Sequence, residues 1–107
     1  MTHIVKVTEI AAVDVDQTYD WIAERSQLGA DHWKSAVSAA ILQLADTAEQ
    51  HPRAAESAII QRDIREPYFK TKSGRKYRLI FAIAEDEVRV LRVRGPGQAP
   101  LNAIDLD

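Results

Sequence analysis

The stretch 75–94, RKYRLIFAIAEDEVRVLRVR, decides how this chain folds. Apolar side chains stand at every second position of its first half, at Tyr77, Leu79, Phe81 and Ile83. A period of two is typical of a strand with one buried face. The acidic pair Glu85-Asp86 follows, and in residues 88–94 Arg92 and Arg94 alternate with Leu91 and Val93. We therefore expect two neighbouring strands, over residues 75–84 and 88–94, joined by a turn at the acidic pair.

The length of this turn decides which side chains share a face of the sheet. A loop with an even number of residues pairs odd positions with even ones. With a four-residue loop, Tyr77 opposes Arg94 and Leu79 opposes Arg92, while Arg78 points to the other face. An odd loop instead brings the three arginines together. We expect an even loop, hence no arginine cluster on one face, which counts against a phosphate site.

Upstream of these strands the apolar pattern changes to that of helices. Residues 3–9 alternate loosely and are rich in β-branched side chains, which predicts a first strand. From Ala11 onward apolar positions recur every three or four residues, and the same stripe reappears over residues 30–44. We expect residues 26–29 to break the first helix and His51-Pro52 to end the second. The short connection predicts an antiparallel helical hairpin.

The remaining segments carry weaker patterns. Residues 59–70 form a weak strand region, in which Pro67 indicates an edge or an interruption. Ser73-Gly74 is a turn, and Gly95-Pro96-Gly97 ends the last strand and begins an irregular tail, 95–107. The order β-α-α-β-β-β predicts a small α+β domain, with a helical hairpin packed on a small antiparallel sheet. We expect the other sheet face to be open for function.

Length and composition exclude several classes of protein. The 107 residues suit one domain, 1–107, and the lack of cysteine excludes disulfides, a thiolate zinc site and a cysteine nucleophile. No apolar run is long enough to cross a bilayer and no signal peptide is recognisable, so we expect a soluble cytoplasmic protein. The net charge is −2, with −5 over residues 1–61 and +5 over residues 62–94. The acidic helical half opposes long-range attraction to RNA.

The histidines and tryptophans suggest structural roles. His3, His32 and His51 lie far apart, without the spacing of metal ligands, and we expect each at the surface. Trp21 and Trp33 lie in the predicted helices, where core or helix packing is the expected role of an indole ring. These residues therefore predict no metal site and no stacking platform.

Taken together, the segments resemble the RelE/ParE superfamily of bacterial toxins from toxin–antitoxin pairs. The resemblance is carried by DVDQTYDWIA at 14–23, the spaced Ala, Trp and Leu of 30–44, His51-Pro52, Ile64-Arg65-Glu66, KYRLIF at 76–81 and VRVLRVR at 88–94. It covers residues 3–94. No single motif is diagnostic, and the order and spacing of the motifs carry the resemblance.

The resemblance implies one of two activities. RelE-like members are ribosome-dependent endoribonucleases that cleave mRNA without a metal, whereas ParE-like members are not nucleases and poison DNA gyrase. Both are neutralised by an antitoxin whose flexible segment folds across the toxin. For this chain the resemblance implies growth inhibition, a role in plasmid stabilisation and a cognate antitoxin. It implies no cofactor and no metal, and it leaves open a homodimer or a heterotetramer with the antitoxin.

The nuclease branch has a Lys-x-Lys pair before its central strand and an arginine on that strand. Three residues resemble this set: Lys70, Lys72 and Arg78. Arginine suits phosphate, because its planar fork donates two parallel hydrogen bonds. That branch also has an arginine beyond the last strand and a tyrosine near the C-terminus, whereas here residues 95–98 are GPGQ and no tyrosine follows Tyr77. Arg92 or Arg94 could supply the arginine, but nothing replaces the tyrosine.

We therefore expect a ParE-like toxin that binds a protein target such as DNA gyrase. The alternatives are the ribosome-dependent nuclease and a non-toxic binding module of the same fold. The residues expected to contact a target or an antitoxin are Arg65, Lys70, Lys72, Arg75, Lys76, Arg78, Arg92 and Arg94. In a plainer interpretation, the cations between 70 and 76 only keep a sheet edge from aggregating. Arg92 and Arg94 then pair with the domain's own carboxylates.

Overall fold

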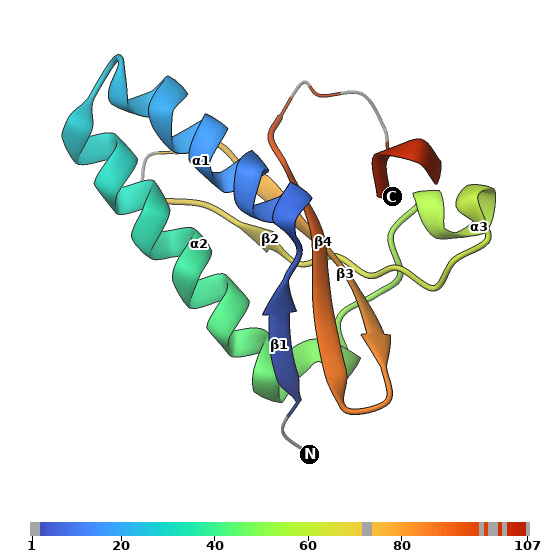
Figure 1. The fold of residues 1–107 in the computed structure, drawn as a ribbon. Helices are drawn as coiled ribbons and strands as arrows, with labels where there is room; N and C mark the ends of the chain where they lie inside the picture. Colours follow the sequence, from blue (N-terminus) through green and yellow to red (C-terminus); the bar gives the residue numbers. More distant parts are fainter. Residues whose placement is uncertain (1–2, 72–73, 97, 99–100, 102, 107) are drawn as a thin grey trace.

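The computed structural model describes residues 3–71, 74–96, 98, 101 and 103–106. Two long helices lie on one face of a four-stranded sheet (Figure 1). The main elements are β1 (Ile4–Val7), α1 (Glu9–Ala23), α2 (Gln27–Thr47), β2 (Tyr68–Phe69), β3 (Tyr77–Ala84) and β4 (Glu87–Arg94). The predicted α+β class and β-α-α-β-β-β order are confirmed. The described residues also form three short helices: η1 (Ala48–Gln50), α3 (Glu56–Ile60) and η2 (Ala103–Leu106).

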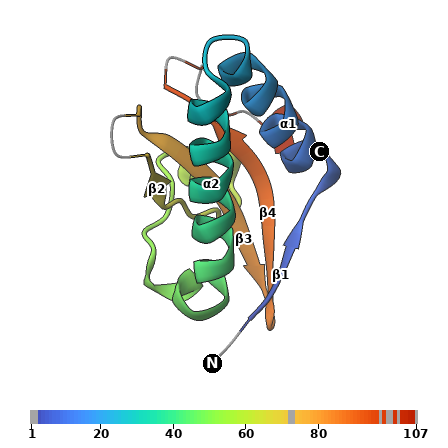
Figure 2. The ribbon, with the colours of Figure 1, turned by 90° about the vertical axis from the view of Figure 1, so that its left-hand side faces the viewer.

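The strand order in the sheet is β1-β4-β3-β2. The β2–β3 and β3–β4 pairs are antiparallel, as predicted, whereas β1 runs parallel to β4. Figure 2 shows α2 lying across β3 and β4 with α1 beside it, so both helices cover the same face. The first and last strands are therefore neighbours in the sheet, and the helical hairpin lies above them.

The two long helices begin where polar side chains cap them. Thr8 Oγ1 accepts a hydrogen bond from Ala11 N at 3.2 Å, and Ser26 Oγ accepts one from Gly29 N at 2.9 Å. These bonds satisfy amide groups that the first turn of a helix leaves unpaired. Each helix thus starts before its apolar stripe, and Gly29 lies inside α2 rather than in the break. No helix among the described residues is long and apolar enough to span a membrane.

Both faces of the sheet are covered, but by different elements. The helix-side core contains Ala11, Val15, Trp33, Val37, Leu44, Tyr77, Leu79, Phe81, Val88, Val90 and Val93. On the opposite face, Ile80 and Leu91 pack with Ile64, Leu101 and Leu106. The expectation of an open face is therefore wrong, because burying these leucines removes apolar surface from water. The tail predicted to be irregular contains η2 and two of these leucines.

The register of the β3–β4 hairpin differs from the prediction. Its turn has two residues, an even number as predicted, with Glu85 in the left-handed region at φ 59°. A β-bulge in the middle of the hairpin then shifts the pairing by one residue, so that Ile80 opposes Arg92 and Arg78 opposes Arg94. A one-residue shift reverses which side chains share a face. The expectation that Arg78 faces away from the other two arginines is therefore wrong.

The segment before β3 also differs from the prediction. Residues 59–70 were expected to form a weak strand, but their beginning belongs to α3 and only β2 pairs as a strand. Arg65 nevertheless exchanges two backbone hydrogen bonds with Phe81, at 2.8 and 3.0 Å. Pro67 has no N–H group to donate, so the ladder is interrupted between this bridge and β2. The segment before β3 thus runs alongside β3 in space without forming a long strand.

The histidines differ in burial. His32 is exposed, as expected, whereas His3 is only 8% exposed and its Nε2 lies 3.5 Å from Glu49 Oε1. The backbone N–H of His3 donates to Ala45 O at 2.7 Å, which draws the residue under the end of α2. His51 is half-buried, with its ring 6.0 Å from that of Phe81. The surface expectation is therefore wrong for His3 and holds only in part for His51.

Candidate functional site

Arg78, the arginine of the nuclease-like set, lies in a largely buried ion cluster. Its Nη1 donates to Glu56 Oε1 at 3.0 Å and to Glu66 Oε2 at 2.7 Å, and its Nη2 donates to Glu56 Oε2 at 2.8 Å. The side chains of Glu56 and Glu66 are only 6% and 10% exposed. Leu101 N also donates to Glu56 Oε2, at 3.1 Å. The cluster thus joins β3, α3 and the C-terminal segment.

The electrostatics of this cluster favour its charged forms. The hydrogen bonds from Arg78 outweigh burial and lower the pKa of Glu56 to about 2. The same bonds, with those to Glu66, raise the pKa of Arg78 above its ordinary value. Glu56 and Arg78 are therefore ionised at neutral pH. A phosphate group at Arg78 would have to displace two carboxylates or bring a further negative charge beside them.

Arg92 and Arg94 are also used inside the fold. Arg92 donates two hydrogen bonds to Asp14 of α1, from Nε to Oδ2 at 2.7 Å and from Nη2 to Oδ1 at 2.9 Å. Val93 N donates to the same carboxylate at 2.9 Å. Asp105 accepts from Arg92 Nη1 through its backbone oxygen at 2.9 Å, and its carboxylate lies 3.7 Å from Arg94 Nη2. Both arginines thus pair with the domain's own carboxylates, as in the plainer interpretation.

Arg65 has a similar internal role. Its Nη1 donates to the backbone oxygens of Glu49 and His51, at 3.1 and 3.0 Å. Its Nε lies 3.9 Å from Asp63 Oδ1. The side chain therefore connects the segment before β2 with the segment that follows α2. Four of the eight basic residues predicted as a binding set, including Arg65 and Arg78, are engaged within the domain.

The connection between β2 and β3 carries the other candidates. We call Lys70, Arg75 and Lys76 the hairpin cations; all three are exposed. None of them forms an ion pair within the described part of the chain. Lys76 Nζ lies 4.8 Å above the ring of Tyr68, itself 54% exposed. Lys72, the fourth candidate, lies outside the described residues. Among the described candidates of the predicted binding set, the cations available to a partner are therefore those of this connection.

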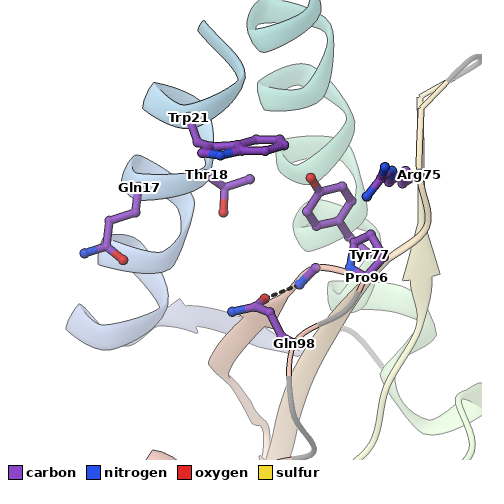
Figure 3. A pocket seen from close by; sticks show the side chains of 8 residues that line it. Gln17, Thr18, Trp21, Arg75, Tyr77, Pro96 and Gln98 are labelled. Atoms are coloured by element: carbon purple, nitrogen blue, oxygen red, sulfur yellow. Dashed lines mark hydrogen bonds between the residues drawn. The ribbon is translucent and has the colours of Figure 1, made fainter. Parts of the chain in front are cut away.

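A cleft of about 370 Å³ opens beside these cations, and we call it the Trp21 cleft. Its lining consists of Gln17, Thr18 and Trp21 of α1, then Arg75, Tyr77, Gly95, Pro96 and Gln98 (Figure 3). Of the two expected roles, core or helix packing, Trp33 takes the core role at 3% exposure, whereas Trp21 is 51% exposed and lies outside the core. Arg25 covers one face of the Trp21 ring, with Cζ 3.9 Å from the ring centroid.

A second cleft, of about 490 Å³, shares Gly95, Pro96 and Gln98 with the first. Ile59, which is 83% exposed, lines it together with Tyr68 and Lys76. The two clefts and the hairpin cations form one continuous region, which we call the hairpin surface. In both clefts aromatic or apolar side chains lie beside a cation, Arg75 in the first and Lys76 in the second, and such a mixture is typical of protein interfaces.

Sequence reasoning missed the apolar part of this surface. A signal for Trp21 was present, because Trp21 precedes Ile22 by one residue and so lies about 100° around the helix from the apolar stripe. Ile59 gave no such signal, since α3 was itself not predicted. The described residues that line the Trp21 cleft include no carboxylate or imidazole. The described lining offers an indole, a phenol and a guanidinium, which are groups suited to binding an apolar or a negatively charged side chain.

The described residues contain no group of three or more His, Cys, Asp or Glu side chains that could hold a metal ion. A family model described as the ParE toxin of the type II toxin–antitoxin system, parDE, matches residues 5–100. Among solved structures, a chain of the chromosomal ParDE toxin–antitoxin system from P. aeruginosa aligns with a TM-score of 0.65 and 19% identity. The alignment covers 88% of this chain and 96% of that one, and shows the shared fold. No curated protein sequence matches the chain significantly.

Proposed function

The chain belongs to the ParE toxin family of type II toxin–antitoxin systems, and on this premise we propose that it binds a protein target such as DNA gyrase. We further propose that a cognate antitoxin neutralises it. The observation that carries the proposal is the division of the basic residues. Arg65, Arg78, Arg92 and Arg94 are engaged inside the domain, whereas the hairpin cations are exposed beside two clefts.

This division favours a protein partner over a polyanion. Each exposed ion pair with a partner contributes at most about 1 kcal/mol, so cations alone do not hold a target tightly. The hairpin surface adds the exposed rings of Trp21 and Tyr68 and the side chain of Ile59, which can supply the apolar centre of an interface. A surface of this composition suits a folded protein or a peptide segment.

The ribosome-dependent nuclease alternative fits the geometry less well. That mechanism needs a guanidinium free to stabilise charge on phosphate oxygens. Arg78 instead donates three hydrogen bonds to two carboxylates. Its remaining donors would have to bind phosphate beside the negative charges of Glu56 and Glu66, which Coulomb repulsion opposes. Of the nuclease-like set, the described residues are thus one exposed lysine, Lys70, and one arginine already paired with carboxylates, Arg78.

Induced expression in a bacterial host tests the proposal. We expect the chain to arrest growth while messenger RNA stays intact. The triple variant Lys70→Glu/Arg75→Glu/Lys76→Glu should lose the arrest, because it reverses the charge of the rim. Lys34→Glu, at a lysine of α2 that is also exposed, is the control and should still arrest growth. Circular dichroism of both variants checks that they fold.

Each other outcome overturns a defined part of the proposal. Normal growth with the unaltered chain would show a non-toxic binding module of the same fold. Arrest accompanied by mRNA cleavage would support the nuclease. Arrest by the triple variant at the rate of the unaltered chain would exclude the hairpin surface as the contact. Co-expression of a small reading frame beside the gene should restore growth, and failure to do so would exclude that frame as the antitoxin.

A further inference from the structure

We propose that the Trp21 cleft is an anchor site for an acidic segment of the antitoxin. In this proposal the cleft takes one large apolar side chain, and Arg75 pairs with a carboxylate next to it. The inference rests on the proposed function, since it assigns the partner and its chemistry to one part of the hairpin surface. Three features of the cleft support it: an indole face, and a hydroxyl group and a guanidinium that have no hydrogen-bond or ion-pair partner among the residues that the structure describes.

The indole of Trp21 forms the apolar wall. Arg25 lies over one face of the ring and also donates from Nη1 to Trp21 O at 2.9 Å, which holds the ring in place. Figure 3 shows the ring above Thr18, at the mouth of the cleft that Tyr77 and Pro96 complete. An aromatic or long aliphatic side chain can pack on this surface. An indole offers a large apolar area, and a second aromatic ring can lie against it in an offset-stacked or edge-to-face arrangement.

The hydroxyl group of Tyr77 supplies a polar group inside the cleft. The Tyr77 ring is fixed in the core, 5.5 Å from Trp33 and 5.7 Å from Phe69 between centroids. Its hydroxyl makes no hydrogen bond with any other residue that the structure describes. Burial raises the pKa of this hydroxyl above 10.0, so it remains a donor at neutral pH. A carbonyl or carboxylate oxygen of a bound segment can satisfy it.

Charge decides which segment fits. Arg75 lines the cleft, and Lys70 and Lys76 are near Arg75 in the sequence. None of the three cations has a carboxylate partner within the described residues. A carboxylate beside the apolar anchor therefore meets a guanidinium that no described carboxylate already occupies. Asp16 and Asp20, both exposed on α1, line a different pocket from the Trp21 cleft, and their negative charges oppose a long polyanion such as RNA that runs along α1. A short acidic peptide segment avoids that repulsion.

The volume of the cleft agrees with a single anchor residue. About 370 Å³ lies near the lower end of the range for small-molecule sites, which is about 300 to 1,000 Å³. A cleft of this size holds one large side chain with its backbone, and the rest of the segment must lie along the hairpin surface. Isolated dipeptides should therefore bind only with millimolar affinity, because they keep one anchor and lose the flanking contacts.

The test uses the two tryptophans as internal reporters. Their indole N–H groups give two NMR signals in the ¹⁵N-labelled chain, one in the cleft and one in the core. The probes are N-acetyl-Phe-Glu-amide, N-acetyl-Phe-Lys-amide and a short uridine oligonucleotide. We expect the Phe-Glu peptide to shift the Trp21 signal while that of Trp33 stays in place. The Phe-Lys peptide should bind about fivefold more weakly, the factor for about 1 kcal/mol from one exposed ion pair.

Arg75→Gln should remove this preference for the acidic peptide, whereas Lys34→Gln, the matched control, should keep it. A Trp21 signal that no peptide shifts at millimolar concentration would overturn the anchor site. Equal binding of the two peptides would overturn the choice of an acidic segment, and tighter binding of the oligonucleotide would overturn the choice of a protein partner. The titration requires no toxicity, so its result is separate from that of the growth experiment.

Discussion

At the scale of single residues, what matters is which carboxylate each arginine meets. The sequence identifies Arg78, Arg92 and Arg94 as candidates, because their residue type and position are visible in it. Their partners are not, since Glu56 is 22 residues from Arg78 and Asp14 is 78 residues from Arg92. Pairing over such distances depends on the complete fold, so the role of these arginines could not be settled from local patterns.

The buried cluster predicts the effect of removing Arg78. Arg78→Ala leaves Glu56 and Glu66 as unpaired, largely buried carboxylates and should lower the free energy of unfolding by about 3–5 kcal/mol. Lys76→Ala, at an exposed neighbouring position, should change it by less than about 0.5 kcal/mol. Urea unfolding of the purified variants measures both. If Arg78→Ala unfolds like the unaltered chain but no longer arrests growth, the structural role assigned to Arg78 is wrong.

At the scale of elements, the long periodic segments were predictable and the irregular ones were not. β3, β4 and the two long helices follow from apolar periodicity, because each has one face buried over several turns or pleats. The β-bulge that brings Arg78 opposite Arg94 lies where the alternation of β4 changes phase, at the adjacent buried residues Val90 and Leu91. That break is visible in the sequence, but it does not by itself give the register against β3. α3 has only five residues, too few for a helical period to be visible, and it occupies a region expected to be a strand.

The end of β4 depends on a glycine. A Cβ atom at Gly95 would lie 2.9 Å from Cε2 and 3.4 Å from Cδ2 of Tyr77, whose ring cannot move freely beside Trp33 and Phe69. Gly95→Ala should therefore destabilise the domain by about 1–3 kcal/mol through overpacking. It should also move the indole N–H signal of Trp33, which is read from the same NMR spectrum.

Gln98→Ala is the control for this prediction. Gln98 Oε1 accepts a hydrogen bond from Gly95 N, so the substitution removes that bond and leaves the ring of Tyr77 in place. Its effect should be within about 1 kcal/mol. Equal stability of Gly95→Ala and the unaltered chain would contradict the close approach of Gly95 and Tyr77.

At the scale of the whole molecule, carboxylates of the acidic first half of the chain pair with arginines of the basic second half inside the fold. The excess of basic groups over residues 62–94 suggested a broad binding face on the sheet. The fold instead uses carboxylates from α1 and α3, and Asp105 of η2, to pair with the sheet arginines. Of the eight basic residues expected to bind a partner, the described ones that stay exposed without such carboxylate partners are Lys70, Arg75 and Lys76, in the connection between β2 and β3. The binding surface we propose is therefore small and lies at one end of the sheet.

The most direct measurement of the central claim is DNA supercoiling by purified gyrase in the presence of the purified chain. We expect the unaltered chain and Lys34→Glu to inhibit supercoiling. The Lys70→Glu/Arg75→Glu/Lys76→Glu variant should need about tenfold more protein, which corresponds to about 1.4 kcal/mol of lost binding. Supercoiling that the unaltered chain leaves unchanged, while the same preparation cleaves mRNA on ribosomes, would contradict the claim that this toxin acts by binding gyrase.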